Sequence, residues 1–521
     1  MIFYSIVYKN IPMKKKGIMI SNDSIDEQQL IFNLPDFRKE SVDFLNPKTY
    51  SGLASFHKYW GKKPIESITF LINKFSREGD IILDPFFGSG LIAKECLLQN
   101  RKFVGMDINP FSYEYATFLL NLPTKQDYFN ALNEIEDLVS GKINESYITS
   151  DNQIASHYLW EKDQICSIWI KPKSGRQRIE IKPSEIDFTT FSFFNNYQPK
   201  EFRDFKFFKN SRINVKPTMT AHDIFTGRAI RNIDLLIEAI SSYPPHLKRA
   251  LLLTLTSSSG QMSNMVFAIR NRKKTGNNNR IEVGSWVIGY WLPETHFEIN
   301  VWNCFKNRAN KLLKSLPIQS EKKFSISEFP PNNEDMDKNA WLINSDCRIT
   351  LRQMPSEIVT FVCTDPPHSD RMPYLELSEL WNSLLGYSSE FEKEIVVSDA
   401  KERGKSKEKY NSDMVEFFIE VTRVLKPNGY IALYFNARDA ESWQFLRDVE
   451  FKTKLLKFIG CFPMVYSATS VIQDNRKGAM KSDYIIIYQK TGNNLDDHSL
   501  VDFTNIPGWT FHFPNAVEIE K

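Results

Sequence analysis

The stretch DIILDPFFGSGLIAKECLLQNRKFVGMDINP, residues 80–110, decides the fold. It reads as a short β-branched strand, a turn with two glycines, a helix, and a second strand that closes at Pro110. The preceding residues, IESITFLINKF (65–75), carry apolar side chains at helical spacing. Helices and strands that alternate in this way predict a parallel sheet with helices on its faces.

Length and composition exclude several classes of protein. The chain has 521 residues, more than one ordinary core, and its formal net charge of +3 gives no argument for nucleic-acid binding. No apolar segment approaches the ~20 residues of a membrane span, and the opening is too weakly apolar for a signal peptide. The six cysteines are scattered, without the spacing of metal ligands or of a disulfide framework. We therefore expect a protein of a reducing cytoplasm, with no membrane segment and no metal.

The alternation of strands and helices is interrupted. Mixed, aromatic and basic sequence occupies residues 125–335, where 234–259 has the spacing of a helix, and the alternation resumes from about 340 to 490. We predict an α/β domain (56–124 and 336–491) split by a large inserted mixed α/β domain (125–335). An N-terminal arm (1–55) and a C-terminal tail (492–521) complete the expected organisation.

The glycine turn has the features of a site for a nucleotide-like cofactor. Gly88 and Gly90 let the backbone turn sharply and approach a ligand, and the helix that follows begins with unpaired N–H groups. Asp107 comes about 20 residues later, where an acid can hold two ribose hydroxyls. A dinucleotide site, an S-adenosylmethionine site and a plain tight turn all fit this pattern. The carboxylate of Asp84 favours S-adenosylmethionine, because it would repel a pyrophosphate but suits a sulfonium and an ammonium group.

A second motif, FVCTDPPHSD (361–370), ends an apolar run with an acid, two prolines and a histidine. The exocyclic amine of a nucleobase is a poor nucleophile because its lone pair is delocalised into the ring. Asp365 and the carbonyl of Pro366 can accept its two N–H bonds, and the prolines keep both acceptors in place. His368 can stack on a base taken out of the helix. The competing interpretation is a turn that only ends a buried strand.

Together these motifs resemble the amino-group DNA methyltransferases, which make N6-methyladenine or N4-methylcytosine. DPFFGSG resembles their cofactor loop, TDPPH their catalytic motif, HKYWGKKP (57–64) the segment over the methionine end of the cofactor, and NSDC (344–347) the strand end at its adenine. The resemblance implies a Rossmann-like class I S-adenosylmethionine-dependent methyltransferase sheet. It implies catalytic roles for Asp365, Pro366, Pro367 and His368, and cofactor contacts from His57, Tyr59, Lys62, Asp84, Pro85, Phe86, Gly88, Ser89, Gly90, Asp107, Ile108, Asp346 and Cys347.

The order of the motifs resembles the group whose target-recognition domain lies between them, and within it a bacterial subgroup of adenine-specific DNA methylases. This implies site-specific methyl transfer to a flipped base of double-stranded DNA, with adenine N6 as the target. A restriction–modification or phage-defence role, with a partner nuclease or defence subunit in the bacterial cytoplasm, also follows from the resemblance. Some members of the subgroup carry a zinc ribbon, but this chain has only Cys166 in that place, so we expect no metal.

One residue departs from the family pattern. The fourth catalytic position is usually Tyr or Phe, and here it is His368. Either activity survives with an altered preference, or the protein is an inactive subunit that binds the cofactor and nucleic acid. Methylation of cytosine N4, methylation of an RNA base and, more distantly, an NAD-dependent dehydrogenase are the remaining alternatives.

The inserted domain is the candidate for DNA recognition. Its segment RNRKKTGNNNR (270–280) places basic side chains around a Gly/Asn turn, which predicts a loop that contacts phosphates. A solvated surface loop is the competing interpretation. The basic residues expected to contact DNA are Arg270, Arg272, Lys273, Lys274 and Arg280.

Overall fold

The computed structural model describes residues 50–171, 178–270, 281–286, 289–319, 323–332, 336–437, 440–465 and 482–494. The predicted arm (1–55) and tail (492–521) therefore lie almost wholly outside the described residues.

An eight-stranded sheet forms one half of the molecule, and its strand order is β13-β14-β12-β11-β1-β2-β10-β9. Every pair of neighbouring strands in it is parallel except the two pairs made by β14, so the largely parallel sheet predicted from the sequence is confirmed. Its strands are β1 (Ile81–Asp84), β2 (Lys102–Asp107), β9 (Ile326–Ser327), β10 (Ala340–Asn344), β11 (Val359–Thr364), β12 (Leu425–Phe435), β13 (Leu456–Val465) and β14 (Ser482–Lys490).

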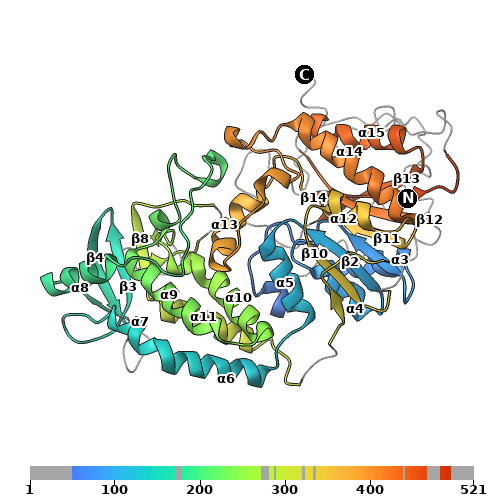
Figure 1. Ribbon diagram of the computed structural model, residues 1–521. Helices are drawn as coiled ribbons and strands as arrows, with labels where there is room; N and C mark the ends of the chain where they lie inside the picture. The colour runs from blue at the N-terminus through green and yellow to red at the C-terminus, as the bar shows by residue number, and fades with distance from the viewer. Residues whose placement is uncertain are drawn as a thin grey trace, which may run out of the picture.

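Helices cover both faces of this sheet because its buried strands alternate their side chains between two cores. Ile82 packs into the core on one face, whereas its neighbours Ile81 and Leu83 pack into the core on the other. The first core contains α3 (Ile65–Phe75), α4 (Leu91–Leu98) and α5 (Pro110–Leu120). The second contains α12 (Cys347–Gln353), α14 (Lys407–Val424) and α15 (Gln444–Thr453) (Figure 1).

The strand order reverses at β1. From β1 the chain passes through α4 to β2 on one side, and β11 pairs with β1 on the other side. In open sheets of this kind, ligands bind beyond the carboxyl ends of the strands at such a reversal. The fold therefore directs attention to the residues that follow β1, β2 and β11.

The insertion has its own antiparallel sheet, with strand order β5-β4-β3-β8, and Figure 1 shows it at the other end of the molecule from the main sheet, with helices between the two. Helix α10 of the insertion packs against α5 and against α13 (Tyr374–Leu384) of the main domain. One short strand inside the predicted range 125–335 behaves differently, because β9 pairs with β10 of the main sheet. The elements of the insertion are α6 (Lys125–Ile135), α7 (Gly141–Glu145), β3 (Ala155–Glu161), β4 (Gln164–Ile170), β5 (Ile179–Ile181), α8 (Glu185–Asn195), α9 (Gly227–Ser241), α10 (Pro245–Met262), β6 (Ala268–Ile269), β7 (Glu282–Val283), β8 (Thr295–Ile299) and α11 (Val301–Leu313).

The single helix predicted over 234–259 is wrong in one respect. The structure divides this region into α9, which ends at Ser241, and α10, which begins at Pro245. A proline inside a helix removes a hydrogen bond and clashes with the preceding turn, whereas a proline fits the first helical position. The Pro244–Pro245 pair therefore ends one apolar helix and starts the next.

Candidate active site

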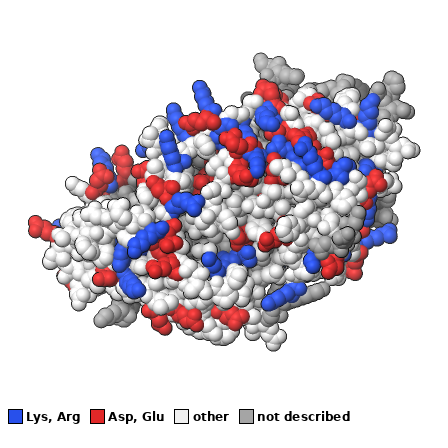
Figure 2. Space-filling view, in the orientation of Figure 1, with Lys and Arg blue, Asp and Glu red and all other residues white. Residues whose placement is uncertain are grey.

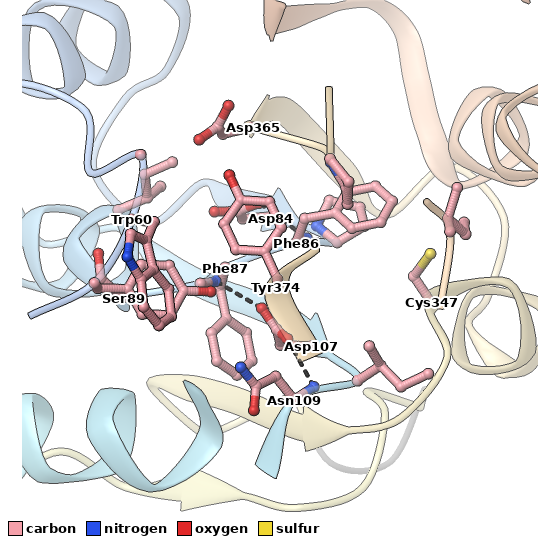
Figure 3. Close-up of a pocket in the computed structure, with 18 of the residues that line it drawn as sticks. Trp60, Asp84, Phe86, Phe87, Ser89, Asp107, Asn109, Cys347, Asp365 and Tyr374 are labelled. Carbon is pink, nitrogen blue, oxygen red and sulfur yellow. Dashed lines mark hydrogen bonds between the residues drawn. The ribbon is translucent and has the colours of Figure 1, made fainter. Parts of the chain in front are cut away.

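An open cavity of about 850 Å³, counting space continuous with solvent, lies at the carboxyl ends of β1, β2, β10 and β11. It brings together residues that are far apart in the sequence: the glycine loop, Asp107, Asp346 and Asp365 all line it. Figure 3 shows Asp84 and Asp365 near one another, with Asp107 and Cys347 further along the same cavity. The structure thus joins the two predicted motifs in one site.

The glycine loop depends on its lack of side chains. Gly88 and Gly90 have φ angles of +51° and +74°, which residues with a Cβ rarely adopt. A Cβ on Gly88 would lie 3.1 Å from the ring of Tyr59, and a Cβ on Gly90 would lie 2.6 Å from the Cβ of Ala116. Gly88 therefore keeps the loop open towards the cavity, and Gly90 lets α4 start against α5.

Asp84 is the most buried carboxylate of the cavity. Its Oδ1 accepts hydrogen bonds from the hydroxyl of Thr364 at 2.7 Å and from the backbone N–H of Phe86 at 3.1 Å. Its side chain has no cationic partner among the described residues, and burial raises the pKa of Asp84 to about 8. A buried carboxylate in this state favours a ligand that brings positive charge.

Asp107 sits at the end of β2, as predicted, and helps to shape the glycine loop. Its two oxygens accept the backbone N–H groups of Gly88 and Asn109, each at 2.8 Å, as the dashed lines in Figure 3 show. Burial raises the pKa of Asp107 to about 7. Pro85, Phe86, Ser89 and Ile108 complete this side of the cavity.

Asp346 and Cys347 also line the cavity, but Asp346 has a structural task as well. It is the N-cap of α12, accepts the backbone N–H of Arg348 at 2.9 Å and pairs with the guanidinium of the same arginine at 2.7 Å. This ion pair orients the carboxylate at the end of β10.

The segment 57–63 contributes to the site unevenly. Tyr59 lines the cavity, and its hydroxyl is 3.1 Å from that of Ser112. Lys62 also lines it and donates to the carbonyls of Ala54 and His57, while burial lowers the pKa of Lys62 to about 7. His57 does not line it: the ring is 1% exposed, hydrogen-bonded to Thr256, and burial lowers its pKa well below the usual value. The structure therefore places His57 in the contact with α10.

The turn predicted to be catalytic, residues 365–368, follows β11 directly. Asp365 lines the cavity, and its Oδ2 accepts a hydrogen bond from the ammonium of Lys63 at 2.6 Å. Pro366 is buried, Pro367 lines the cavity, and the carbonyl of Pro367 accepts the hydroxyl of Tyr410 at 2.7 Å. The acceptors predicted for an amine are thus held by a fixed turn.

His368 is not among the residues that line the cavity. Its ring is 5% exposed, packs edge-on against Phe435, and its Nε2 is 3.0 Å from Oδ1 of Asp365. Its Nδ1 is 3.1 Å from a guanidinium nitrogen of Arg371, which can only donate. Nδ1 is therefore the acceptor, so Nε2 carries a hydrogen, which it can donate to Asp365 and to the carbonyl of Tyr434 at 3.1 Å.

Two residues in the site were not among the catalytic and cofactor-binding residues predicted above, although Tyr374 lies close enough to the motif in sequence to be a weaker candidate. Lys63 pairs with Asp365 across more than 300 residues of sequence, a contact that only the fold reveals. Tyr374, at the start of α13, lines the cavity and stacks on Tyr59 with ring centroids 6.2 Å apart. The signal for Tyr374 was its place shortly after the catalytic motif, and the signal for Lys63 was its place in HKYWGKKP.

Only one of the five predicted DNA contacts can be located. Arg270 forms an ion pair with Glu161, whereas Arg272, Lys273, Lys274 and Arg280 lie outside the described residues. Within the described ranges, no helix is long and apolar enough to cross a membrane. In that same part of the chain, no group of three or more His, Cys, Asp or Glu side chains is placed to hold a metal ion.

Comparison with known proteins agrees with this geometry. The family described as DNA methylase matches residues 13–118, which include the glycine loop and Asp107. Over 79 residues the chain is 39% identical to the Type II methyltransferase M.XycI of Xanthomonas campestris pv. cyanopsidis, a match that covers 15% of this chain and 24% of that protein. It is 36% identical over 83 residues to the Type II methyltransferase M.Cfr9I of Citrobacter freundii, covering 16% and 25% of the two chains.

Over this segment the chain is similar to the amino-group DNA methyltransferases. These matches span about a quarter of the length of the relatives. The similarity to this family implies S-adenosylmethionine as the methyl donor, and the site fits that ligand. Two buried carboxylates with raised pKa values suit a cation, and the side-chain-free face of Gly88 leaves room for it.

Proposed function

We propose that this methyltransferase moves a methyl group from S-adenosylmethionine to an exocyclic amine of a base in double-stranded DNA, with adenine N6 as the target. One observation carries the proposal: Asp365 of the catalytic turn and Asp84 of the glycine loop line the same cavity. A methyl donor held by the loop would lie beside an amine held by the turn, and positioning of this kind supplies much of the rate.

In this proposal the glycine loop and its neighbours hold the donor. Asp84 offers negative charge to the cationic end of the ligand, and Asp107 and Asp346 mark the ends of β2 and β10 where ribose and adenine would lie. The ligand supplies an activated methyl group when bound. Tyr59 and Lys62 also line the cavity, and the Tyr59 ring lies against Gly88 of the loop.

The catalytic turn prepares the base. Asp365 and the Pro366 carbonyl accept the two N–H bonds of the amine, so that the lone pair is localised on nitrogen and aimed at the methyl group. Asp365 then receives the proton that the nitrogen loses as the new N–C bond forms. Because Tyr374 lines the cavity and His368 does not, we assign the stacking contact with the flipped base to Tyr374.

We assign His368 a positioning role. Its Nε2–H donates to one oxygen of Asp365, while Lys63 donates to the other. The two donors hold the carboxylate in one orientation before the base arrives. A histidine at the fourth position is then compatible with an active enzyme.

The test is methyl transfer from tritiated S-adenosylmethionine to unmethylated duplex DNA and, in parallel, to structured RNA, followed by mass spectrometry of the nucleosides. N6-methyladenine in DNA is the expected product. N4-methylcytosine would keep the reaction and change the base, methylated RNA would change the substrate, and no methylated product from either would reject the proposal.

A further inference from the structure

A second large cavity lies in the insertion, away from the site described above. It occupies about 1590 Å³, counting space open to solvent, between the antiparallel sheet and the helices α10 and α11. Its walls include Ser156 and Trp169 from the sheet, Gln261 from α10, and Asn303 and Asn307 from α11. These side chains offer hydrogen bonds to a polar ligand.

The charges in this cavity all have one sign. Lys171, Arg178, Arg308 and Lys311 line it, and among the residues that the structure describes no aspartate or glutamate does. Arg178 pairs with Glu180. Within the described ranges, Lys171, Arg308 and Lys311 have no carboxylate at ion-pair distance.

Most other described arginines of the insertion pair with acids. The pairs are Arg212–Asp370, Arg228–Glu298, Arg231–Glu145, Arg249–Glu114 and Arg270–Glu161, whereas Arg203 donates to the hydroxyl of Ser388. Figure 2 shows the same mixing on the visible face, where blue and red side chains lie among one another. The cavity is therefore a local positive site on a nearly neutral protein.

One further observation points to an anionic ligand. Arg308 donates one hydrogen bond to the carbonyl of Phe56 at 3.1 Å, and a guanidinium has five N–H groups to offer. Its other N–H groups suit the oxygens of a phosphate.

We propose that this cavity is a second ligand site, which binds phosphate groups of the nucleic-acid backbone. The inference rests on the proposed function, because bound DNA is the source of phosphates that it names; a free nucleotide would offer the same chemistry. Arg308 also connects the cavity to the main site, since Phe56 precedes the segment Tyr59–Lys63 that lines the cofactor cavity.

The test measures binding of a labelled duplex oligonucleotide as a function of salt. Lys171→Ala and Lys311→Ala remove exposed lysines of the cavity, and Lys314→Ala removes an exposed lysine just beyond α11 that does not line it. Each lost phosphate contact lowers the slope of log affinity against log salt by about 0.9. We expect the magnitude of this slope to fall by about 0.9 for each single cavity variant and by about 1.8 for the double variant, Lys171→Ala/Lys311→Ala. The slope should not change for Lys314→Ala, and S-adenosylmethionine binding should be unchanged in all of these variants.

The outcomes separate this inference from the proposed function. If the wild type methylates DNA and the cavity variants keep the wild-type salt slope, the second site is rejected and the function stands. If the wild type methylates no DNA, the proposed function is rejected, and binding of mononucleotides to the protein tests the cavity instead. Mononucleotide binding by the wild type that the double variant loses would support a site for free nucleotides. No mononucleotide binding by the wild type would reject the second site.

Discussion

Raising the pH from 6 to 8 should strengthen S-adenosylmethionine binding, because Asp84 must lose its proton to face a cation. Burial raises the pKa of Asp84 to about 8, so the carboxyl is neutral at pH 6 in the free protein and half ionised at pH 8. A cationic ligand stabilises the ionised form. Binding therefore releases a proton, and the affinity rises with pH up to the pKa of the free site.

The size of the effect follows from the ionised fraction of Asp84. With a pKa of about 8 this fraction is about 1 in 100 at pH 6 and 1 in 2 at pH 8, so the affinity should rise roughly 50-fold. Asp107, whose pKa burial raises to about 7, can add a factor of up to about 10 over the same range.

Isothermal titration calorimetry at pH 6, 7 and 8 and constant ionic strength measures this dependence. Asp84→Asn is the control, because the ammonium of the ligand titrates equally in both proteins and cancels in their ratio. The variant should bind weakly and retain at most the roughly tenfold rise from Asp107. Thr364→Val removes the hydrogen bond that lowers the pKa of Asp84 and should move the rise to higher pH. Equal affinity of the wild type at pH 6 and 8, or the full rise in Asp84→Asn, would refute the reasoning.

Three substitutions test other parts of the account. Gly90→Ala should lower the free energy of unfolding in urea by about 1–3 kcal/mol, because the backbone at Gly90 is left-handed and the new Cβ meets Ala116. Gly141→Ala is the control and should not destabilise the protein, because Gly141 has open space around it. Equal stability of the two variants would contradict this prediction. Arg228→Met should lower the free energy of unfolding by about 3–5 kcal/mol, because it leaves the buried carboxylate of Glu298 without its partner. The double variant Arg228→Met/Glu298→Leu should regain much of that stability. A double variant no more stable than Arg228→Met would argue against an unpaired charge as the cause. His368→Phe keeps an aromatic ring but removes the hydrogen-bond donor to Asp365, so the rate of single-turnover methyl transfer should fall about 100-fold with unchanged cofactor affinity. His368→Gln, which can still donate, should recover part of the rate. Full activity of His368→Phe would instead favour a role in stacking on the base.

The sequence predicted what depends on local chemistry. The strand–turn–helix at 80–98 has the form that its β-branched run and two glycines indicated, and Asp107 lies beside that turn because parallel strands end at one edge of a sheet. The order of the eight strands could not be read from the chain. It depends on which apolar faces pack together after more than 200 residues of insertion.

The surroundings of three residues of the site depend on long-range contacts. His57 matches a cofactor-lid motif, yet α10 of the insertion supplies Thr256 as its hydrogen-bond partner and encloses the ring. His368 was expected to face a base, but β12 presents the Tyr434 carbonyl and Phe435 to it and holds it inside. Lys63 reaches the catalytic carboxylate for the same reason, since the segment before α3 crosses the end of β11. No spacing rule within one segment contains these neighbours.

Single-turnover methyl transfer by Asp365→Ala tests the central claim most directly. The wild type, Asp365→Ala and Asp399→Ala, an exposed acid outside the cavity, are mixed with tritiated S-adenosylmethionine and unmethylated bacterial genomic DNA. We predict N6-methyladenine from the wild type and Asp399→Ala, and a rate at least about 100-fold lower from Asp365→Ala with its cofactor affinity preserved. A wild-type rate from Asp365→Ala would contradict the account.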